Sequence, residues 1–407
     1  MGKIIQLDDS LSNLIAAGEV VENMASVVKE LVENSIDAQS ENIIIDLLDT
    51  GLNEIKVTDD GLGMSKDDVL MCFKRHATSK IKTSHDLYHI STLGFRGEAI
   101  PSIASVSHME IISSEGVVGY RILLKNGKTI EEGSYSPRRG TSISVKYLFY
   151  NTPARLKHLK ATNTELSYIV DYINKMALSH PEISFTLTND GKRMFKSPGT
   201  NDYLKVLSNI YSLDIIKNMI YFTGENQYFS ISGYIAKPQF TRSSRNHVTI
   251  IANNRMIKNS KVINAVTEGY KTYLPVGKYP IAFIKIDLDP LLIDVNIHPQ
   301  KLEVKFTEER LLLSLIKNTV NAYLQTLNLI PEMKERKVEE PYKYDKLNLT
   351  TPVEHPQLVK EDFIKVIDKM VEKKSSKELP VIEPQKPQDQ KVPNMEYIGT
   401  FMGTYLI

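Results

Sequence analysis

Several groups of residues in this chain have the types and spacing that chemistry on a small ligand needs. The first lies in SVVKELVENSIDA, where Glu30, Asn34 and Asp37 recur at helical spacing. At about 100° per residue, these side chains fall within ~60° of one another on a helix. A carboxylate can take a proton from water, and an amide oxygen is a neutral ligand for a hard cation such as Mg²⁺. The same spacing also fits an ordinary solvated helix face.

A second group, Asp59-Asp60-Gly61-Leu62-Gly63, follows the strand-like segment EIKVT. A carboxylate at a strand end can accept a hydrogen bond from the amino group of adenine. Glycines directly after it let the backbone approach a flat base closely. The alternative is a simple glycine turn between a strand and a helix.

A third group is the glycine loop Leu93-Gly94-Phe95-Arg96-Gly97-Glu98-Ala99, with hydroxyls and a positive charge just upstream in Thr78-Ser79-Lys80. Backbone N–H groups of such a loop can bind phosphates, and a helix after Glu98 would point its positive end the same way. The Walker and Rossmann glycine patterns are absent from the sequence. In the segment DVNIHPQKLEVKF, Lys301 follows a His-Pro turn and could reach a phosphate at a distance, although an ordinary exposed lysine fits equally.

Length and composition limit the class of protein. A chain of 407 residues exceeds one compact core, which predicts two folded domains and a tail. The net charge of +1 excludes a uniformly basic nucleic-acid coat but not a local basic strip. The single cysteine, Cys72, excludes an intrachain disulfide and fits a reducing compartment. No apolar run approaches the ~20 residues that a bilayer requires, so we expect a cytoplasmic protein with no membrane partner.

The elements that must position these residues are predicted from hydrophobic periodicity. Residues 1–37 are rich in helix formers, with Ser26 as the expected cap. Asn126-Gly127 is typical of a hairpin turn. An amphipathic helix is expected over 164–180. Short β-branched runs predict strands in NIIIDLLD, EIKVTDD, MEIISS, VGYRILLK, KTIEEGSYS, TSISVKYLF and ISFTLTND, which together complete a first domain over residues 1–200.

A second domain of the α+β class is predicted over residues 201–330. Its strands are expected in QYFSISGYI, HVTIIANN and YPIAFIKIDL, and its helices in KVINAVTEGYKTYL and ERLLLSLIKNTVNAYLQTL. Residues 331–394 hold eight of the 18 prolines and many charges, which predicts a disordered, flexible linker. Residues 395–407 turn apolar again and are expected to be the first strand of a further domain that is cut short.

In this order and spacing, the motifs resemble those of the MutL family of DNA mismatch repair proteins. That family belongs to the ATPase superfamily of gyrase, a heat-shock chaperone and histidine kinases. The resemblance covers residues 1–330 and implies a gyrase-type ATPase α/β sandwich, then an α+β domain like the second domain of ribosomal protein S five. Residues 395–407 would open the C-terminal dimerisation domain of the family. The strings that carry the resemblance are IAAGEVVENMASVVKELVENSIDA, RHATSKI, LGFRGEA, LFYNTPARLKHLK, NNRMI and DVNIHPQKLEVKF.

The resemblance also implies roles for single residues. Glu30 would be the general base that positions the attacking water, and Lys301 would reach the γ-phosphate from the second domain. Asn34 would bind Mg²⁺, and Asp59 would bind adenine together with Thr141. The remaining residues implied to bind ATP are Asp37, Gly61, Gly63, Thr78, Ser79, Lys80, Gly94, Phe95, Arg96 and Gly97.

The implied activity is slow ATP hydrolysis that drives an ATP-dependent homodimer of the N-terminal domains. The implied partners are a MutS-type mismatch recognition protein, DNA without sequence specificity, and a downstream endonuclease or helicase. The Asp-Gln-His-Ala type motif of the nuclease-bearing relatives does not occur in the sequence, so we expect no endonuclease site here. Contacts to DNA phosphates are expected from Arg155, Lys157, Arg242, Arg245, Arg255 and Lys258, which would otherwise be ordinary surface charges.

Two other functions remain as alternatives. A gyrase-type topoisomerase subunit would need a strand-passage region and a cleavage tyrosine, and both the length of 407 residues and the MutL-type strings argue against it. A nucleotide-binding scaffold that does not hydrolyse ATP is the other alternative, and Glu30 argues against that.

Overall fold

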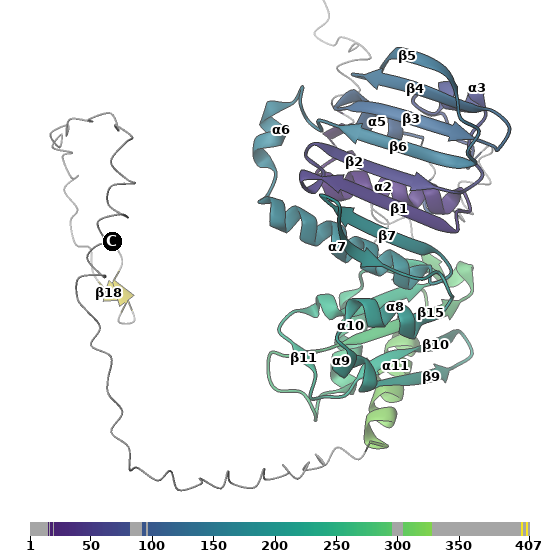
Figure 1. The fold of residues 1–407 in the computed structure, drawn as a ribbon. Coiled ribbons are helices and arrows are strands. Elements are labelled where there is room, and N and C mark those ends of the chain that lie inside the picture. The colour runs from purple at the N-terminus through teal and green to yellow at the C-terminus, as the bar shows by residue number, and fades with distance from the viewer. Residues whose placement is uncertain are drawn as a thin grey trace, which may run out of the picture. The chain divides into compact units, whose positions relative to one another are not determined.

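The computed structural model describes two units of the chain (Figure 1), each considered by itself. Residues 1–330 form one compact unit and residues 331–407 the other. In the second unit, β18 (Thr400–Phe401) pairs antiparallel with β19 (Thr404–Tyr405). The predicted linker, 331–394, lies outside the described residues. Those residues are 15, 17–18, 20–81, 92–94, 97–294, 304–327, 400–401 and 404–405.

An eight-stranded sheet with the order β5-β4-β3-β6-β2-β1-β7-β8 carries the first half of the larger unit (Figure 1). Its neighbours pair antiparallel, except that β1 and β7 run parallel. The predicted Asn126-Gly127 turn joins β4 to β5, and both residues have positive φ, 53° and 70°. The strands are β1 (Asn42–Leu48), β2 (Glu54–Asp59), β3 (His108–Ser114), β4 (Gly119–Lys125), β5 (Lys128–Tyr135), β6 (Gly140–Lys146), β7 (Ser184–Asn189) and β8 (Lys192–Lys196).

Helices cover one face of this sheet, and alternation along the strands explains why. In β1, Ile43, Ile45 and Leu47 are buried, while Ile44 on the opposite face is exposed. Helix α2 (Met24–Asp37) packs on the sheet with a buried apolar side that includes Val28, Leu31 and Val32. The other α-helices of this half are α3 (Lys66–Met71), α5 (Ala99–Ser105), α6 (Pro153–His158) and α7 (Thr162–Ser179). A short 3₁₀ helix, η1 (Asp49–Gly51), lies between β1 and β2.

The start of α2 differs from the prediction. Asn23, not Ser26, is the N-cap, because its side chain accepts from the Ser26 backbone N–H at 2.9 Å. Ser26 occupies the third helical position, where its hydroxyl accepts from the Asn23 backbone N–H at 3.0 Å. The two residues form a reciprocal capping box, in which serine takes the place that glutamate or glutamine usually has. The N-cap therefore lies three residues before the predicted one, and the helix begins at Met24.

The second half of the unit is a five-stranded sheet with the order β13-β12-β15-β10-β9, in which β12 and β15 are parallel. Helices α10 and α11 pack on each other and, through Leu312, Ile316 and Val320 of α11, on the core of this sheet. The elements are α8 (Tyr203–Ile210), α9 (Leu213–Lys217), β9 (Met219–Glu225), β10 (Phe229–Ala236), β11 (Thr241–Arg242), η2 (Arg245–His247), β12 (Val248–Ala252), β13 (Arg255–Ile257), α10 (Ser260–Gly269), β14 (Tyr279–Pro280), β15 (Ala282–Leu288), η3 (Pro290–Leu292), β16 (Ile293–Asp294), β17 (Lys305–Phe306) and α11 (Glu309–Gln325).

The two halves share apolar packing. Ile251 of β12 and Phe283 of β15 belong to the same buried cluster as the core of the first sheet. Tyr203 of the second half also packs against this cluster, and its ring lies 4.9 Å from that of Phe283 between centroids. The α+β class predicted from the sequence is confirmed.

Candidate functional site

The polar side of α2 carries the three residues that the helical spacing places together. Glu30, Asn34 and Asp37 are each partly buried, opposite the apolar side of the helix. The next residue after Asn34, Ser35, is buried and turned toward the end of strand β2. Two neighbouring residues of one helix therefore face two different groups, one at Asp59 and one at Lys80.

Asp59 closes strand β2, and its carboxylate is fixed by backbone and side-chain donors. The amides of Gly61 and Thr141 donate to Oδ1 at 3.0 Å and 3.1 Å, and the hydroxyl of Ser35 donates to Oδ2 at 2.8 Å. Burial raises the pKa of Asp59 above its ordinary value of 3.8, and these hydrogen bonds act in the opposite direction. Asp59 and Thr141, which the sequence analysis grouped, do lie together.

Glycines around Asp59 bring backbone segments closer than any side chain would permit. A Cβ on Gly61 would lie 2.6 Å from the carbonyl oxygen of Ala38, and one on Gly140 would lie 2.1 Å from the carbonyl oxygen of Asp59. Gly63 has a φ of +75°, and a Cβ there would meet the carbonyl oxygen of Ser114 at 2.0 Å. The backbone itself therefore forms this end of the site.

The second group joins α2 to the glycine loop through Asp37 and Lys80. The ammonium of Lys80 lies 2.5 Å from Asp37 Oδ2 and donates to Asn34 Oδ1 at 2.8 Å. The backbone amides of Leu93 and Gly94 donate to the two oxygens of Asp37 at 2.9 Å and 3.1 Å. A Cβ on Gly94 would come within 3.2 Å of Lys80 Nζ. Lys80, Leu93 and Gly94 thus meet at the carboxylate of Asp37, although they are 43, 56 and 57 positions away in the chain.

The other residues predicted to bind phosphates have different surroundings. Thr78 accepts from the backbone N–H of Lys80 at 3.2 Å, and Ser79 is exposed. Gly97 has a φ of +62° and packs on the backbone of Ala77. Phe95, Arg96 and Lys301 lie outside the described residues.

The predicted DNA contacts fall into different surroundings. Lys157 and Lys258 are exposed. Arg245 is exposed too, donates from Nε to the hydroxyl of Tyr279 at 3.0 Å and stacks over that ring. The guanidinium of Arg155 lies against Gly18.

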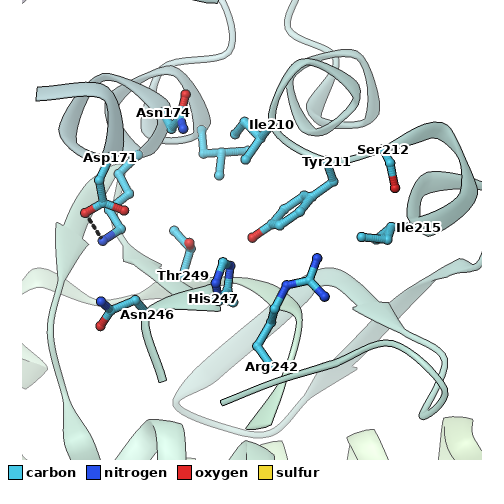
Figure 2. A pocket seen from close by; sticks show the side chains of 12 residues that line it. Asp171, Asn174, Ile210, Tyr211, Ser212, Ile215, Arg242, Asn246, His247 and Thr249 are labelled. Carbon is cyan, nitrogen blue, oxygen red and sulfur yellow. Dashed lines mark hydrogen bonds and ion pairs between the residues drawn. The ribbon is translucent and has the colours of Figure 1, made fainter. Parts of the chain in front are cut away.

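Arg242 lines a partly open pocket of about 310 Å³ between α7, the segment after α8 and the second sheet (Figure 2). Burial raises the pKa of Tyr211 in this pocket to about 12, and burial together with Arg242 lowers the pKa of His247. Lys175 is paired with Asp171 at 2.6 Å. Arg242 therefore lines a pocket to which both halves of the unit contribute residues. Its side chain is less accessible to a DNA duplex than that of Lys258.

Arg255 does not lie on an open surface. It is half-buried, and its Nη2 donates to the carbonyl oxygen of Thr92 at 3.0 Å. That carbonyl belongs to the loop which holds Asp37. Arg255 therefore differs from the exposed cations Lys157, Arg245 and Lys258 and is less accessible to DNA.

Two further facts concern the described residues as a whole. No helix among them is both long and apolar enough to cross a bilayer. No group of three or more histidine, cysteine, aspartate or glutamate side chains among them is arranged to hold a metal ion.

Two protein-family models match parts of the chain. Residues 22–134 match the model of histidine kinase-, DNA gyrase B-, and HSP90-like ATPases, and this span includes α2, Asp59, Lys80 and Gly94. This part of the chain, which carries α2 and strands β1 to β4, is therefore similar to that class of ATPases. Residues 207–325 match the model of the C-terminal domain of DNA mismatch repair proteins.

Individual relatives identify the family more specifically than the two family models do. The DNA mismatch repair protein MutL of Anoxybacillus flavithermus is 53% identical over 84% of this chain and 56% of its own length. MutL of a Geobacillus species is 47% identical over 97% of this chain and 64% of its own length. The chain belongs to the MutL family of DNA mismatch repair proteins, and it spans between half and two thirds of the length of these relatives.

Solved structures share the fold. The N-terminal domain of a DNA repair protein superposes with a TM-score of 0.67 at 26% identity, over 77% of this chain and 97% of that one. The Aquifex aeolicus MutL ATPase domain complexed with ADP superposes with a TM-score of 0.52 at 21% identity, over 74% of this chain and 98% of that one.

Proposed function

We propose that the chain binds ATP with Mg²⁺ and hydrolyses it slowly, and that this cycle serves DNA mismatch repair. One observation carries the proposal. Asn34 and Ser35, adjacent on α2, connect a buried carboxylate at a strand end with an ion-paired cluster beside a glycine loop. The first group suits a purine base, and the second suits phosphates and their cation.

The Asp59 end would bind adenine. A carboxylate oxygen accepts the hydrogen bond that the exocyclic amino group of adenine donates, whereas guanine presents a carbonyl oxygen at that position. Gly61 and Gly140, where a Cβ would meet backbone atoms, would add no side chain beside the adenine ring. Selectivity for adenine over guanine follows, because two acceptors would face each other in the wrong complex.

The Lys80 end would hold the phosphates and Mg²⁺. Asn34 Oδ1 and the Asp37 carboxylate are oxygen donors of the kind that Mg²⁺ takes, and the ion supplies charge neutralisation to phosphates when bound. Two such oxygens fit an ion that keeps several waters and shares phosphate oxygens. Lys80 bridges both oxygens, so the ammonium would have to shift toward the phosphates to release Asn34.

Glu30 would act as the general base. It lies one turn before Asn34 on the polar side of α2, so its carboxylate and the cation ligand share one rigid support. Phosphoryl transfer depends mainly on positioning and charge neutralisation, so a single base with a fixed support suits slow turnover. Lys301 would reach the terminal phosphate from the second domain and report its presence by domain movement.

At the level of the cell, we propose that nucleotide binding promotes dimerisation of the N-terminal domains and couples a MutS-type mismatch recognition protein to a downstream endonuclease or helicase. DNA would bind without sequence specificity through exposed cations such as Arg245 and Lys258. We also propose a cytoplasmic location, which suits a chain with the single cysteine Cys72.

The test is binding and turnover by the full chain with ATP or GTP, in Mg²⁺ or in a chelator. We expect ATP to bind at least tenfold more tightly than GTP, since an unpaired buried acceptor costs roughly 1–3 kcal/mol. We expect phosphate release in Mg²⁺ and none in the chelator. Failure of ATP to bind would end the proposal.

A further inference from the structure

We propose that Arg255 is a positioning residue that links the second sheet to the nucleotide site through residues 92–94. The inference rests on the proposed function, because it assigns a means of coupling to the same site. It differs from the role proposed for Lys301, because Arg255 acts on the protein loop and needs no contact with a phosphate.

The backbone that carries Arg255 is anchored to the second sheet. This residue lies in a hairpin. It begins strand β13 after a two-residue turn, Asn253-Asn254, whose φ angles of 46° and 62° suit a tight hairpin. The side chain of Asn253 donates to the carbonyl oxygen of Leu288 at 2.9 Å and accepts from the backbone N–H of Leu288 at 3.0 Å. The tip of the hairpin is therefore fastened to the end of β15, and Arg255 moves with the second sheet.

The guanidinium of Arg255 is aimed at the first domain. Nη2 donates to the Thr92 carbonyl oxygen at 3.0 Å, and Nη1 is buried with no hydrogen-bond partner among the described residues. Burial lowers the pKa of Arg255, while the negative charges of Glu33 and Asp37 oppose that effect. A charge kept out of water in this way is expensive unless the surrounding charges and dipoles offset it, so the location is unlike that of a surface cation.

Residues 92–94 convert this contact into a restraint on Asp37. The hydroxyl of Thr92 donates to the carbonyl oxygen of Gly94 at 2.6 Å, which closes the short segment on itself. The amides of Leu93 and Gly94 then donate to Asp37, the partner of Lys80. One side of the segment is thus held by Arg255 and the other by the carboxylate of the phosphate end. Displacement of the second sheet would therefore displace the amides that orient Asp37.

This arrangement predicts an effect on nucleotide affinity more than on the chemical step. The amides of Leu93 and Gly94 donate to Asp37, the last residue of α2 and the partner of Lys80, whereas Glu30 lies about two turns earlier on that helix. Loss of the Arg255 contact should therefore raise the KM for ATP by about tenfold, the size expected for one charge-assisted hydrogen bond. The kcat should change by less than about twofold, since the base and its support are untouched.

The experiment compares Arg255→Met, Arg255→Lys and the control Arg310→Met in the full chain. Arg310 is an exposed arginine of the same domain, near the start of α11. Hydrogen exchange of a peptide that spans residues 92–94, measured without nucleotide, reports the link directly. The KM and kcat for ATP report its consequence, and melting temperatures separate it from general loss of stability.

We expect faster exchange at 92–94 and the higher KM in Arg255→Met, partial recovery in Arg255→Lys, and wild-type behaviour in Arg310→Met. Unchanged exchange and KM in a folded Arg255→Met protein would overturn the inference, even with ATP turnover intact. Conversely, a wild-type chain that binds no ATP would defeat the proposed function, while the exchange result would still decide whether the link exists.

Discussion

The two ends of the proposed nucleotide site are built by different means. At the Asp59 end, the carboxylate is 6% exposed, backbone amides fix it, and glycines let main-chain atoms close around it. At the Lys80 end, side chains hold one another, with Lys80 and Asp37 18% and 7% exposed and 2.5 Å apart. A backbone-built end can recognise an invariant base, and a side-chain-built end can exchange partners during a reaction cycle.

Glu30 lies one turn before Asn34 on α2, and its substitution gives the largest expected effect. Glu30→Ala should lower kcat by at least ~10²-fold, the usual contribution of a general base, and leave ATP affinity within about threefold. Phosphate release and equilibrium nucleotide binding measure the two quantities. Glu41→Ala is the matched control, since Glu41 is exposed at the start of the first sheet. Undiminished turnover in Glu30→Ala would remove Glu30 from the role of base.

Asp59→Asn tests the backbone-built end. It should weaken ATP binding by about 10–100-fold, because the amide replaces an acceptor with a donor at one position and removes the charge. The same change should raise the melting temperature, because a buried charge is lost. A gain of about 2–4 °C corresponds to roughly 1 kcal/mol in a protein of this size.

The pH dependence of that gain follows from the sign of the shift. Burial raises the folded-state pKa of Asp59 above 3.8, so the stability that Asp59 contributes is greatest below that value and falls as pH rises through the folded-state pKa. The advantage of Asp59→Asn should therefore be full at neutral pH and shrink toward pH 3.8. If Asp59→Asn melted at a lower temperature than the wild type at neutral pH, the hydrogen bonds to Asp59 would outweigh the cost of its burial.

Asn34→Ala tests the side-chain-built end. We expect about tenfold weaker binding of ATP in Mg²⁺ and little change in a chelator, since the lost group is a cation ligand. Asn209→Ala is the control, because Asn209 is exposed on α8 and bonds to its own helix. Equal affinities for Asn34→Ala and wild type in Mg²⁺ would argue against ligation by Asn34.

The elements that position the site were predictable because their burial is periodic. Strand β1 alternates buried and exposed residues, and α2 keeps its apolar residues on one side. Strand β8 was missed because Phe195 is its one buried residue, so its sequence carries no alternation. Strand β9 and the short helices α8 and α9 were missed too, since short elements whose packing partners lie elsewhere in the chain have little periodic signal.

The site was predictable where sequence motifs are local. Asp59 with Gly61, and Asn34 with Asp37, are close in the chain and close in space. Ser35 was missed, although a buried serine among the apolar residues of α2 was a usable signal, since buried hydroxyls need partners. The contact from Arg255 to Thr92 had no local signal, because the two residues are 163 positions apart.

DNA binding gives the smallest expected effect and separates exposed cations from buried ones. Lys258→Ala should weaken binding of a random-sequence duplex by about 2–5-fold and reduce the slope of log affinity against log salt by ~1, as for one lost phosphate contact. Arg255→Met, measured without nucleotide, should leave that slope unchanged because its guanidinium faces Thr92. A fluorescence titration over a range of salt concentrations measures both. Equal losses of slope in the two variants would show that Arg255 reaches DNA and that the distinction between the two cations is wrong.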